Sequence, residues 1–167
     1  MEEYPQRRYV RFKDMSQENI LFIAYQFAPL NVGGTQIALK FAKYLPTFDI
    51  NPIIITLSDE CYPLIYKNID VDNELLNDLN CNTEIIKIKS GNLLAGQKSK
   101  FGAFTSLWFS IVRKEAKYWK KNLLNELPEI IKKFNPKLVF VTAPPFSMIP
   151  LAYVIAKKYK LPLILDL

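Results

Sequence analysis

Histidine is absent from this sequence of 167 residues. Its absence removes the commonest general base and the commonest metal ligand of proteins. Cysteine is scarce, because only Cys61 and Cys81 occur, and their separation of 20 residues fits neither a metal-binding nor a redox motif. We therefore expect no metal site, and we expect both cysteines to be reduced, partly buried thiols.

Long apolar runs are also missing, since no stretch approaches the ~20 apolar residues that span a bilayer. The N-terminal segment, MEEYPQRRYVRFKDMSQEN, is polar and contains no apolar signal core. We interpret residues 1–19 as a basic, flexible tail and the protein as cytoplasmic.

Acidic residues are outnumbered: the chain contains 22 Lys and Arg but only 16 Asp and Glu, which gives a formal net charge of +6. This excess favours phosphorylated ligands, polyanions or an anionic membrane face, and it does not choose among them. No recognised nucleic-acid-binding module accompanies the charge, so we expect no nucleic-acid partner.

Short apolar runs alternate with stretches of helical periodicity along the chain. Strands are expected at residues 20–25, 53–57, 84–89, 138–141 and 163–167. Helices are expected from residue 35 to 45, near 72–79, over most of 105–134, and after 147. Alternation of this kind is typical of an α/β fold with a parallel sheet and helices on both faces. We predict one Rossmann-like three-layer sandwich over residues 20–167, with the sheet order 3-2-1-4-5.

Two details of the helices are specific enough to test. The first helix carries a stripe of apolar residues that we expect to be buried: Ile37, Ala38, Phe41, Ala42 and Leu45. Pro128 is expected to open a second helix inside the stretch 105–134, because proline suits a first helical turn and breaks an interior.

Two irregular loops follow the first and fourth strands: YQFAPLNVGGTQ at 25–36 and TAPPFS at 142–147. In the order 3-2-1-4-5 the winding reverses between these strands, and ligands bind at that switch point. Gly33 and Gly34 lack a Cβ and open a helix, whose first amides favour a phosphate. Thr35 adds a hydroxyl. The alternative is that the glycines only permit a turn and a helix start, and that Ser147 only caps the next helix.

Known nucleotide motifs do not match. The dinucleotide fingerprint G-x-G-x-x-G lies directly against a strand end, whereas these glycines come eight residues after Tyr25. The lysine motif of the phosphate-binding loop is also missing, so nicotinamide and ATP sites are disfavoured.

Two stretches carry a family resemblance: ILFIAYQFAPLNVGGTQIALKFAKYL and LVFVTAPPFSMIPLAYVIAKKYKLPLILDL. They resemble the N-terminal domain of bacterial family 4 glycosyltransferases, which have two Rossmann-like domains in the arrangement called GT-B. The likeness covers residues 20–57 and 136–167. It implies transfer of a sugar from a nucleotide-sugar to a glycan or a lipid-linked acceptor, with retention of configuration, without a metal and with no cofactor other than the nucleotide-sugar co-substrate.

The resemblance also implies roles for single residues. Gly33, Gly34 and Thr35 would contact the donor phosphates, reaching across the cleft from this domain. The acceptor side would be lined by Phe27, Pro29, Asn31, Pro144, Pro145, Phe146, Ser147 and Asp166. The resemblance identifies no catalytic residue in this chain.

The sequence departs from the family in two ways. The family's donor motif has two glutamates with seven residues between them, and no two glutamates here have that spacing. The C-terminal donor domain is expected to be missing from this chain and to be supplied in cis or in trans. We therefore expect an acceptor-side half that is inactive alone, because phosphate departure without a metal needs positive charge from both walls. The alternative is a non-catalytic subunit that recruits a membrane acceptor or a donor-domain partner.

A basic aromatic segment, KSKFGAFTSLWFSIVRKEAKYWKK, occupies residues 98–121. Basic amphipathic helices can lie on anionic membranes, and this one would present Trp108, Arg113, Lys117, Trp119, Lys120 and Lys121. Such docking would place the protein at the inner face of the cytoplasmic membrane. The alternative is a helix packed on the sheet with a solvated basic side.

Overall fold

The computed structural model describes residues 18–66, 70–81, 83–90 and 114–167, and for residues 64 and 114–118 it describes the backbone alone. The expected tail therefore lies almost wholly outside the described residues. The start of the helix expected from residue 105 lies outside them as well.

Five parallel strands form the sheet: β1 (Glu18–Ile23), β2 (Ile50–Leu57), β3 (Glu84–Ile88), β4 (Val139–Thr142) and β5 (Leu163–Asp166). Their order is β3-β2-β1-β4-β5, which confirms the predicted topology. β1 begins at Glu18, two residues earlier than expected, because Glu18 and Asn19 pair in register with Ile50 and Asn51.

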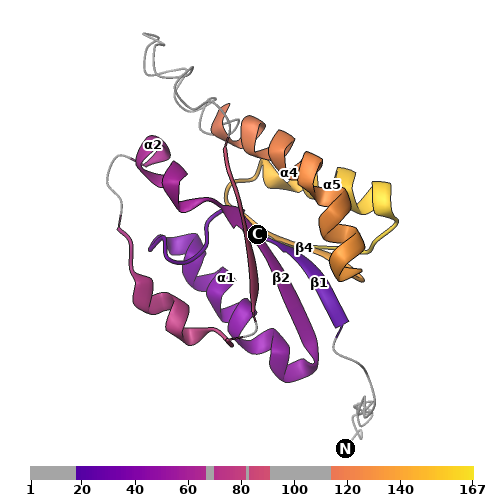
Figure 1. Cartoon of the computed structure of the whole chain (residues 1–167), viewed down its shortest axis with the longest axis horizontal. Helices are drawn as coiled ribbons and strands as arrows, with labels where there is room; N and C mark the ends of the chain where they lie inside the picture. The colour runs from indigo at the N-terminus through magenta and orange to yellow at the C-terminus, as the bar shows by residue number, and fades with distance from the viewer. Residues whose placement is uncertain (1–17, 67–69, 82, 91–113) are drawn as a thin grey trace, which may run out of the picture.

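Helices cover the sheet on both faces, as Figure 1 shows. One face carries α1 (Gly33–Tyr44), the 3₁₀ helix η1 (Leu45–Phe48) and the 3₁₀ helix η3 (Asn73–Asp78). The other face carries α4 (Lys114–Phe134) and α5 (Met148–Tyr159). Two short turns of helix, η2 (Asp59–Cys61) and α2 (Tyr62–Ile65), follow β2. This is the predicted three-layer α/β sandwich.

The core consists of two apolar clusters, one on each face of the sheet. Successive side chains of a strand point to opposite faces, so Leu21 and Ile23 pack toward α4 and α5, while Ile20 and Phe22 pack toward α1. On the α1 side, Phe22 stacks on Phe140 of β4 with ring centroids 4.8 Å apart. Both clusters are continuous along β1, which makes β1 the central strand of the domain.

Pro128 does not open a new helix, contrary to the prediction, because α4 is one helix of 21 residues that runs through it. The proline lies on the exposed side, while Leu127 and Ile130 next to it are buried. An interior proline costs about 3 kcal/mol. Each buried leucine or isoleucine contributes about 1.5–3 kcal/mol, so packing of the apolar stripe of α4 outweighs the lost hydrogen bond.

The apolar stripe predicted for the first helix is only half correct. Ala38 and Ala42 are fully buried, together with Thr35 and Leu39, but Ile37 is 51% and Phe41 36% exposed. The buried line is thus rotated around the helix from the predicted one. On α5 the buried residues are Met148, Leu151, Ala152, Ile155 and Ala156.

The two cysteines differ from each other, and neither forms a disulfide. Cys61 is buried and accepts a hydrogen bond from the backbone amide of Ser90 at 3.4 Å, whereas Cys81 is exposed. The expectation of a partly buried thiol is therefore wrong for Cys81, which lies outside the core beyond η3.

Candidate functional site

The two irregular loops meet at one small pocket of about 200 Å³. Its lining combines the beginning of the first loop, the start of α1, the second loop and the ends of β4 and β5: Gln26, Gly33, Gly34, Ile37, Thr142, Ala143, Pro144 and Asp166. The pocket lies at the carboxyl ends of the parallel strands, where the winding of the sheet reverses. This is the place at which open α/β sheets bind their ligands.

Strand register brings Asp166 to this edge. Thr142, the last residue of β4, pairs with Asp166, the last residue of β5. The amide of Ala143 then donates to the carbonyl oxygen of Asp166 at 3.0 Å. The pairing fixes the backbone of Asp166 at the pocket beside Pro144, so the place of this residue in the lining follows from the sheet and not from a flexible loop.

The start of α1 forms another part of the lining and presents bare backbone. Val32 occupies the N-cap position without a side-chain hydrogen bond to the helix, and the first turn contains no acidic residue. The first amides of a helix have no intrahelical partner and carry about half a positive charge. The Gly33–Gly34 end of α1 is therefore a positive, donor-rich wall that no carboxylate of its own first turn neutralises.

Gln26 fits against Gly34 because glycine has no side chain. A Cβ on Gly34 would lie 2.9 Å from Gln26 Oε1 and 3.9 Å from Pro144 Cδ, whereas a Cβ on Gly33 would meet no atom within 4 Å. The other end of the same amide, Nε2, donates to the Tyr66 hydroxyl oxygen at 3.0 Å. Tyr66 thus holds the amide with its oxygen toward Gly34 and the pocket.

These groups give the pocket lining both hydrogen-bond donors and hydrogen-bond acceptors. The helix start donates hydrogen bonds and favours an anion. The Asp166 carboxylate and the Gln26 oxygen accept hydrogen bonds, and Thr142 adds a hydroxyl that can do either. The arrangement suits a ligand that places hydroxyl groups next to an oxyanion.

Four of the predicted ligand contacts, Gly33, Gly34, Pro144 and Asp166, line this pocket. Others do not. Thr35 is fully buried under the first turn of α1, and its hydroxyl has no hydrogen-bond partner among the described residues. Thr35 is not part of the pocket lining.

Three residues predicted to bind an acceptor lie in the first loop but outside the pocket lining, and two of them are buried. Phe27 is fully buried in the core cluster on the α1 side, so it cannot touch a ligand. Pro29 is buried as well, and its carbonyl oxygen accepts from the Asp72 amide at 2.8 Å. Asn31 donates to Asp70 Oδ2 at 2.7 Å and accepts from Gln36, which fastens the loop to the segment before η3.

The remaining residues of the second loop lie outside the pocket lining. Phe146 is 58% exposed, and Pro145 is half-buried with its carbonyl accepting from the Met148 amide at 2.9 Å. Ser147 occupies the N-cap of α5 but forms no side-chain capping bond, so the predicted cap is wrong. Its hydroxyl is buried without a hydrogen-bond partner in the described part of the chain.

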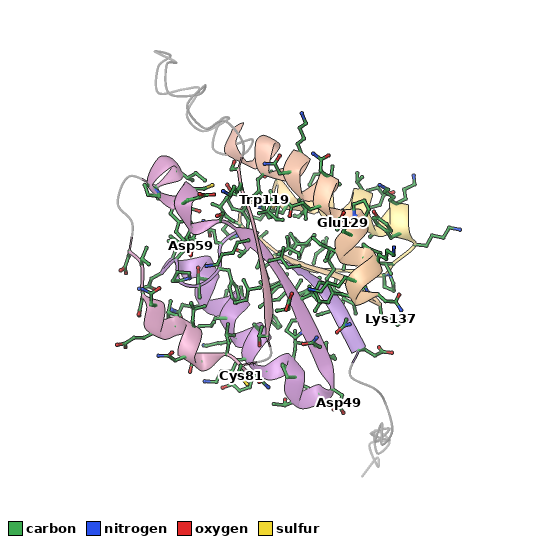
Figure 2. The ribbon with its side chains drawn as sticks, in the orientation of Figure 1. Asp49, Asp59, Cys81, Trp119, Glu129 and Lys137 are labelled. Atoms are coloured by element: carbon green, nitrogen blue, oxygen red, sulfur yellow. The ribbon has the colours of Figure 1, made fainter. Side chains whose placement is uncertain are left out.

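The predicted membrane-facing surface is contradicted at Trp119. This side chain has no exposed surface, lies between α4 and the sheet (Figure 2), and donates from Nε1 to the Thr56 carbonyl at 3.4 Å. Tyr25 meets it edge to face, with ring centroids 5.2 Å apart. A tryptophan held in this way packs the helix on the sheet and cannot enter a membrane.

The other residues of that predicted surface divide into three groups. Lys121 is exposed, and Lys120 is half-buried, so desolvation lowers the pKa of its ammonium group from the ordinary value. Trp108 and Arg113 lie outside the described residues, as does the side chain of Lys117. Among the helices of the described residues, none combines the length and apolar character needed to cross a bilayer.

The prediction from sequence missed Gln26, Ile37, Thr142 and Ala143 as pocket residues. Thr142 could have been identified by the rule that ligands lie at carboxyl ends of parallel strands, since it ends β4. Gln26 follows β1 closely and has the same signal. Ile37 carries no such signal, because its apolar side chain was assigned to the core.

Comparison with known proteins shows the fold and no more. No protein-family model matches the chain, and no curated protein does. Two crystal structures of the C-terminal domain of a hydrogenase from Pyrococcus furiosus are similar to it, each at 16% sequence identity. The TM-scores of the two alignments are 0.51 and 0.52. The first alignment covers 92% of this chain and 93% of the hydrogenase domain, and the second covers 90% and 92%. At this identity the likeness concerns the fold alone.

Proposed function

We propose that this chain is the acceptor-side half of a nucleotide-sugar-dependent glycosyltransferase of the GT-B type. The observation that carries the proposal is the convergence of the Gly33–Gly34 helix start and the Pro144 loop on one pocket that also contains Asp166. The family resemblance of exactly these two loops supports the same function. In this proposal the nucleotide-sugar is a co-substrate, and no further cofactor takes part.

The chemistry of the pocket lining suits a sugar next to a phosphate. Asp166 and the Gln26 oxygen accept hydrogen bonds from sugar hydroxyls, and a hydrogen bond to a charged group contributes about 1.5–3 kcal/mol. The start of α1 attracts the donor phosphate by about 0.3–1 kcal/mol, or up to ~2 kcal/mol when partly buried. This attraction is modest, so a second, donor-binding domain has to supply the remaining positive charge.

The acceptor in this proposal is a glycan or a lipid-linked sugar, and the reaction takes place on the cytoplasmic side of the membrane. A lipid-linked acceptor would bring the domain to an anionic membrane surface. Such a surface attracts cationic side chains by about 1 kcal/mol each. Lys121 on α4 and Lys157 and Lys158 on α5 are exposed and suited to this contact.

A non-catalytic subunit that recruits an acceptor is the second candidate. It is favoured by one observation: among the described residues, Asp166 is the single ionisable side chain in the pocket lining. One carboxylate binds a hydroxyl group but does not complete a catalytic site. The two candidates share the acceptor and differ in whether a donor-domain polypeptide restores sugar transfer.

Saturation-transfer NMR with methyl glycosides of common hexoses, and separately with UDP-sugars, tests the proposal. We expect signals from glycoside ring protons, and we expect Asp166→Asn to abolish them. Asp49→Asn is the matched control, because Asp49 is exposed just before β2, and its positive φ of 60° also suits asparagine. Tight binding of a nucleotide by this chain alone would contradict the proposed division between acceptor and donor halves.

A further inference from the structure

Thr142, the last residue of β4, carries a buried hydroxyl group without a partner. The residue is 7% exposed, and among the described residues none forms a hydrogen bond with its Oγ1. The hydroxyl groups of Thr35 and Ser147 also lack a partner in the described part of the chain, but they are sealed from solvent, whereas Thr142 Oγ1 keeps some surface. Thr142 lines the pocket, so this surface opens into it. An unpaired buried hydroxyl group is unfavourable, and a ligand in the pocket would satisfy it.

Strand register sets the side chain of Asp166 beside this hydroxyl group. Phe140 points to the face of α1, and side chains alternate along a strand, so Thr142 points to the same face. Asp166 is the register partner of Thr142 in the parallel pair, so its side chain points there too. Neighbouring strands lie about 4.8 Å apart, which places the hydroxyl group next to the carboxylate. Asp166 makes no ion pair with a described residue, so its carboxylate is available to a ligand.

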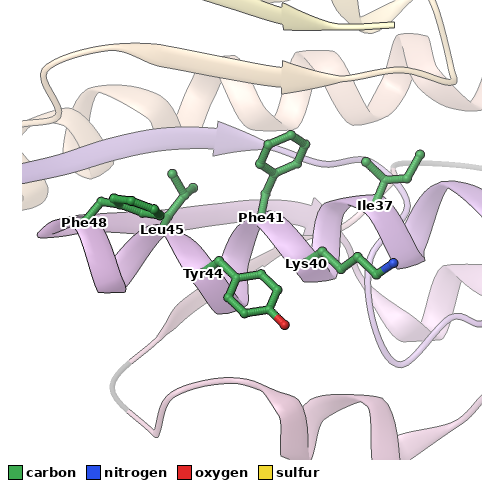
Figure 3. Close-up of a pocket in the computed structure, with 6 residues that line it drawn as sticks. All are labelled: Ile37, Lys40, Phe41, Tyr44, Leu45 and Phe48. Carbon is green, nitrogen blue, oxygen red and sulfur yellow. The ribbon is translucent and has the colours of Figure 1, made fainter. Parts of the chain in front are cut away.

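Ile37 adds an apolar surface above this polar pair. Figure 3 shows Ile37 on the same edge of α1 as Phe41. Phe41 meets Phe140 of β4 edge to face, with ring centroids 4.9 Å apart, so this edge of α1 faces β4. Ile37 lines the pocket and is 51% exposed. The pocket thus offers an apolar side chain and an adjacent pair of polar groups, which match the C–H face and the hydroxyl groups of a sugar ring.

We propose that Thr142 and Asp166 together recognise two neighbouring hydroxyl groups of one sugar ring, and that Thr142 determines the specificity of the site. The inference rests on the proposed function, because it takes the acceptor to be a sugar. The pocket volume of about 200 Å³ is smaller than the ~300–1,000 Å³ of sites for drug-sized ligands, so it holds a single ring.

The chemistry of the two side chains selects a vicinal diol. A carboxylate only accepts hydrogen bonds, whereas a threonine hydroxyl group both donates and accepts. One ligand hydroxyl group therefore donates to Asp166, and its neighbour on the ring exchanges a hydrogen bond with Thr142 Oγ1. A site that hydrogen-bonds a hydroxyl group strongly rejects an analogue that lacks it, because the buried polar group of the site is then left unpaired.

Thr142→Val tests the hydroxyl group, because valine keeps the shape of the side chain. The whole chain is titrated with the methyl pyranosides of glucose, galactose and mannose, followed by saturation-transfer NMR. We expect Thr142→Val to weaken glycoside binding by about tenfold and Thr142→Ser, which keeps the hydroxyl group, to restore most of the affinity. The Tm of Thr142→Val should equal or exceed that of the wild type, because the substitution removes an unpaired buried group.

Thr56→Val is the matched control. Thr56 is fully buried outside the pocket lining, and its hydroxyl group donates to the Tyr25 carbonyl oxygen at 3.3 Å. Loss of this hydrogen bond should lower the Tm by about 2–4 °C and leave glycoside affinity unchanged. The two threonines should thus show opposite patterns of stability and binding. A lowered Tm with unchanged affinity in Thr142→Val would give Thr142 a structural role and overturn the inference.

Monodeoxy analogues of the glycoside that binds locate the contact. In the wild type, two analogues that lack adjacent hydroxyl groups should bind about tenfold more weakly. In Thr142→Val one of these two losses should vanish, because that hydroxyl group has already lost its partner. Equal losses in both proteins would overturn the inference, while the proposed function would stand if Asp166→Asn still abolishes binding. If the wild type binds none of the glycosides, the proposed function fails, and the inference fails with it.

Discussion

The side chain of Gln26 occupies the space that a side chain on residue 34 would need. The amide oxygen of Gln26 lies 2.9 Å from the position of a Cβ on Gly34, and Tyr66 holds the amide nitrogen at 3.0 Å. The candidate pocket thus includes a contact between a side chain after β1 and bare backbone at the start of α1.

Substitution at the two glycines should therefore have different structural effects. Gly34→Ala should displace the Gln26 side chain, because the new methyl group occupies its place, while Gly33→Ala should leave it bonded to Tyr66. Side-chain amide resonances of Gln26 in ¹⁵N NMR spectra report this directly. Neither glycine has a positive φ, so both variants should fold. Unchanged Gln26 resonances in Gly34→Ala would refute the contact.

Trp119→Ala should destabilise the protein by about 3–5 kcal/mol, because a fully buried aromatic ring leaves a cavity. Lys121→Ala, two residues further along α4 and exposed, should change stability by less than about 0.5 kcal/mol. Urea denaturation measures both. A small loss for Trp119→Ala, combined with lost binding to anionic vesicles, would instead support the membrane-facing surface expected from sequence.

Pro128→Ala should stabilise α4. The substitution restores a backbone donor and removes the ring clash at an exposed position, and an interior proline costs up to ~3 kcal/mol. Pro150→Ala is the matched control, because Pro150 is also exposed but lies in the first turn of α5, where proline costs little. Thermal unfolding should show a higher Tm for the first variant alone; equal Tm values would argue against a regular hydrogen-bonded helix around Pro128.

The two cysteines should react with a thiol reagent at very different rates. Cys81 is exposed, whereas burial raises the pKa of the Cys61 thiol above its ordinary value. Folding therefore favours protonated Cys61. Its contribution to stability is complete below the unfolded pKa and is lost as pH rises through the folded pKa. With Ellman's reagent at mildly alkaline pH, the native protein should release one equivalent quickly, and Cys81→Ser should react only on unfolding. Fast labelling of native Cys81→Ser would contradict the burial of Cys61.

Local sequence was enough for the framework of the site. Short apolar runs such as Ile53–Leu57 identify strands without knowledge of the tertiary structure, and the right-handed crossover rule then orders the strands. That order places the Gly33–Gly34 and Pro144 loops at one edge of the sheet before any coordinate is known.

Tertiary structure decided which side chains reach the ligand side. Phe27 turned into the core and Gln26 toward the pocket, although both follow β1, because the path of an irregular loop sets side-chain directions and no periodicity encodes it. In the same way, Trp119 is buried since Tyr25 and the Thr56 carbonyl surround it, and Phe41 is partly exposed since no described helix covers β5. Burial depends on what packs against a residue, and that partner is distant in the sequence.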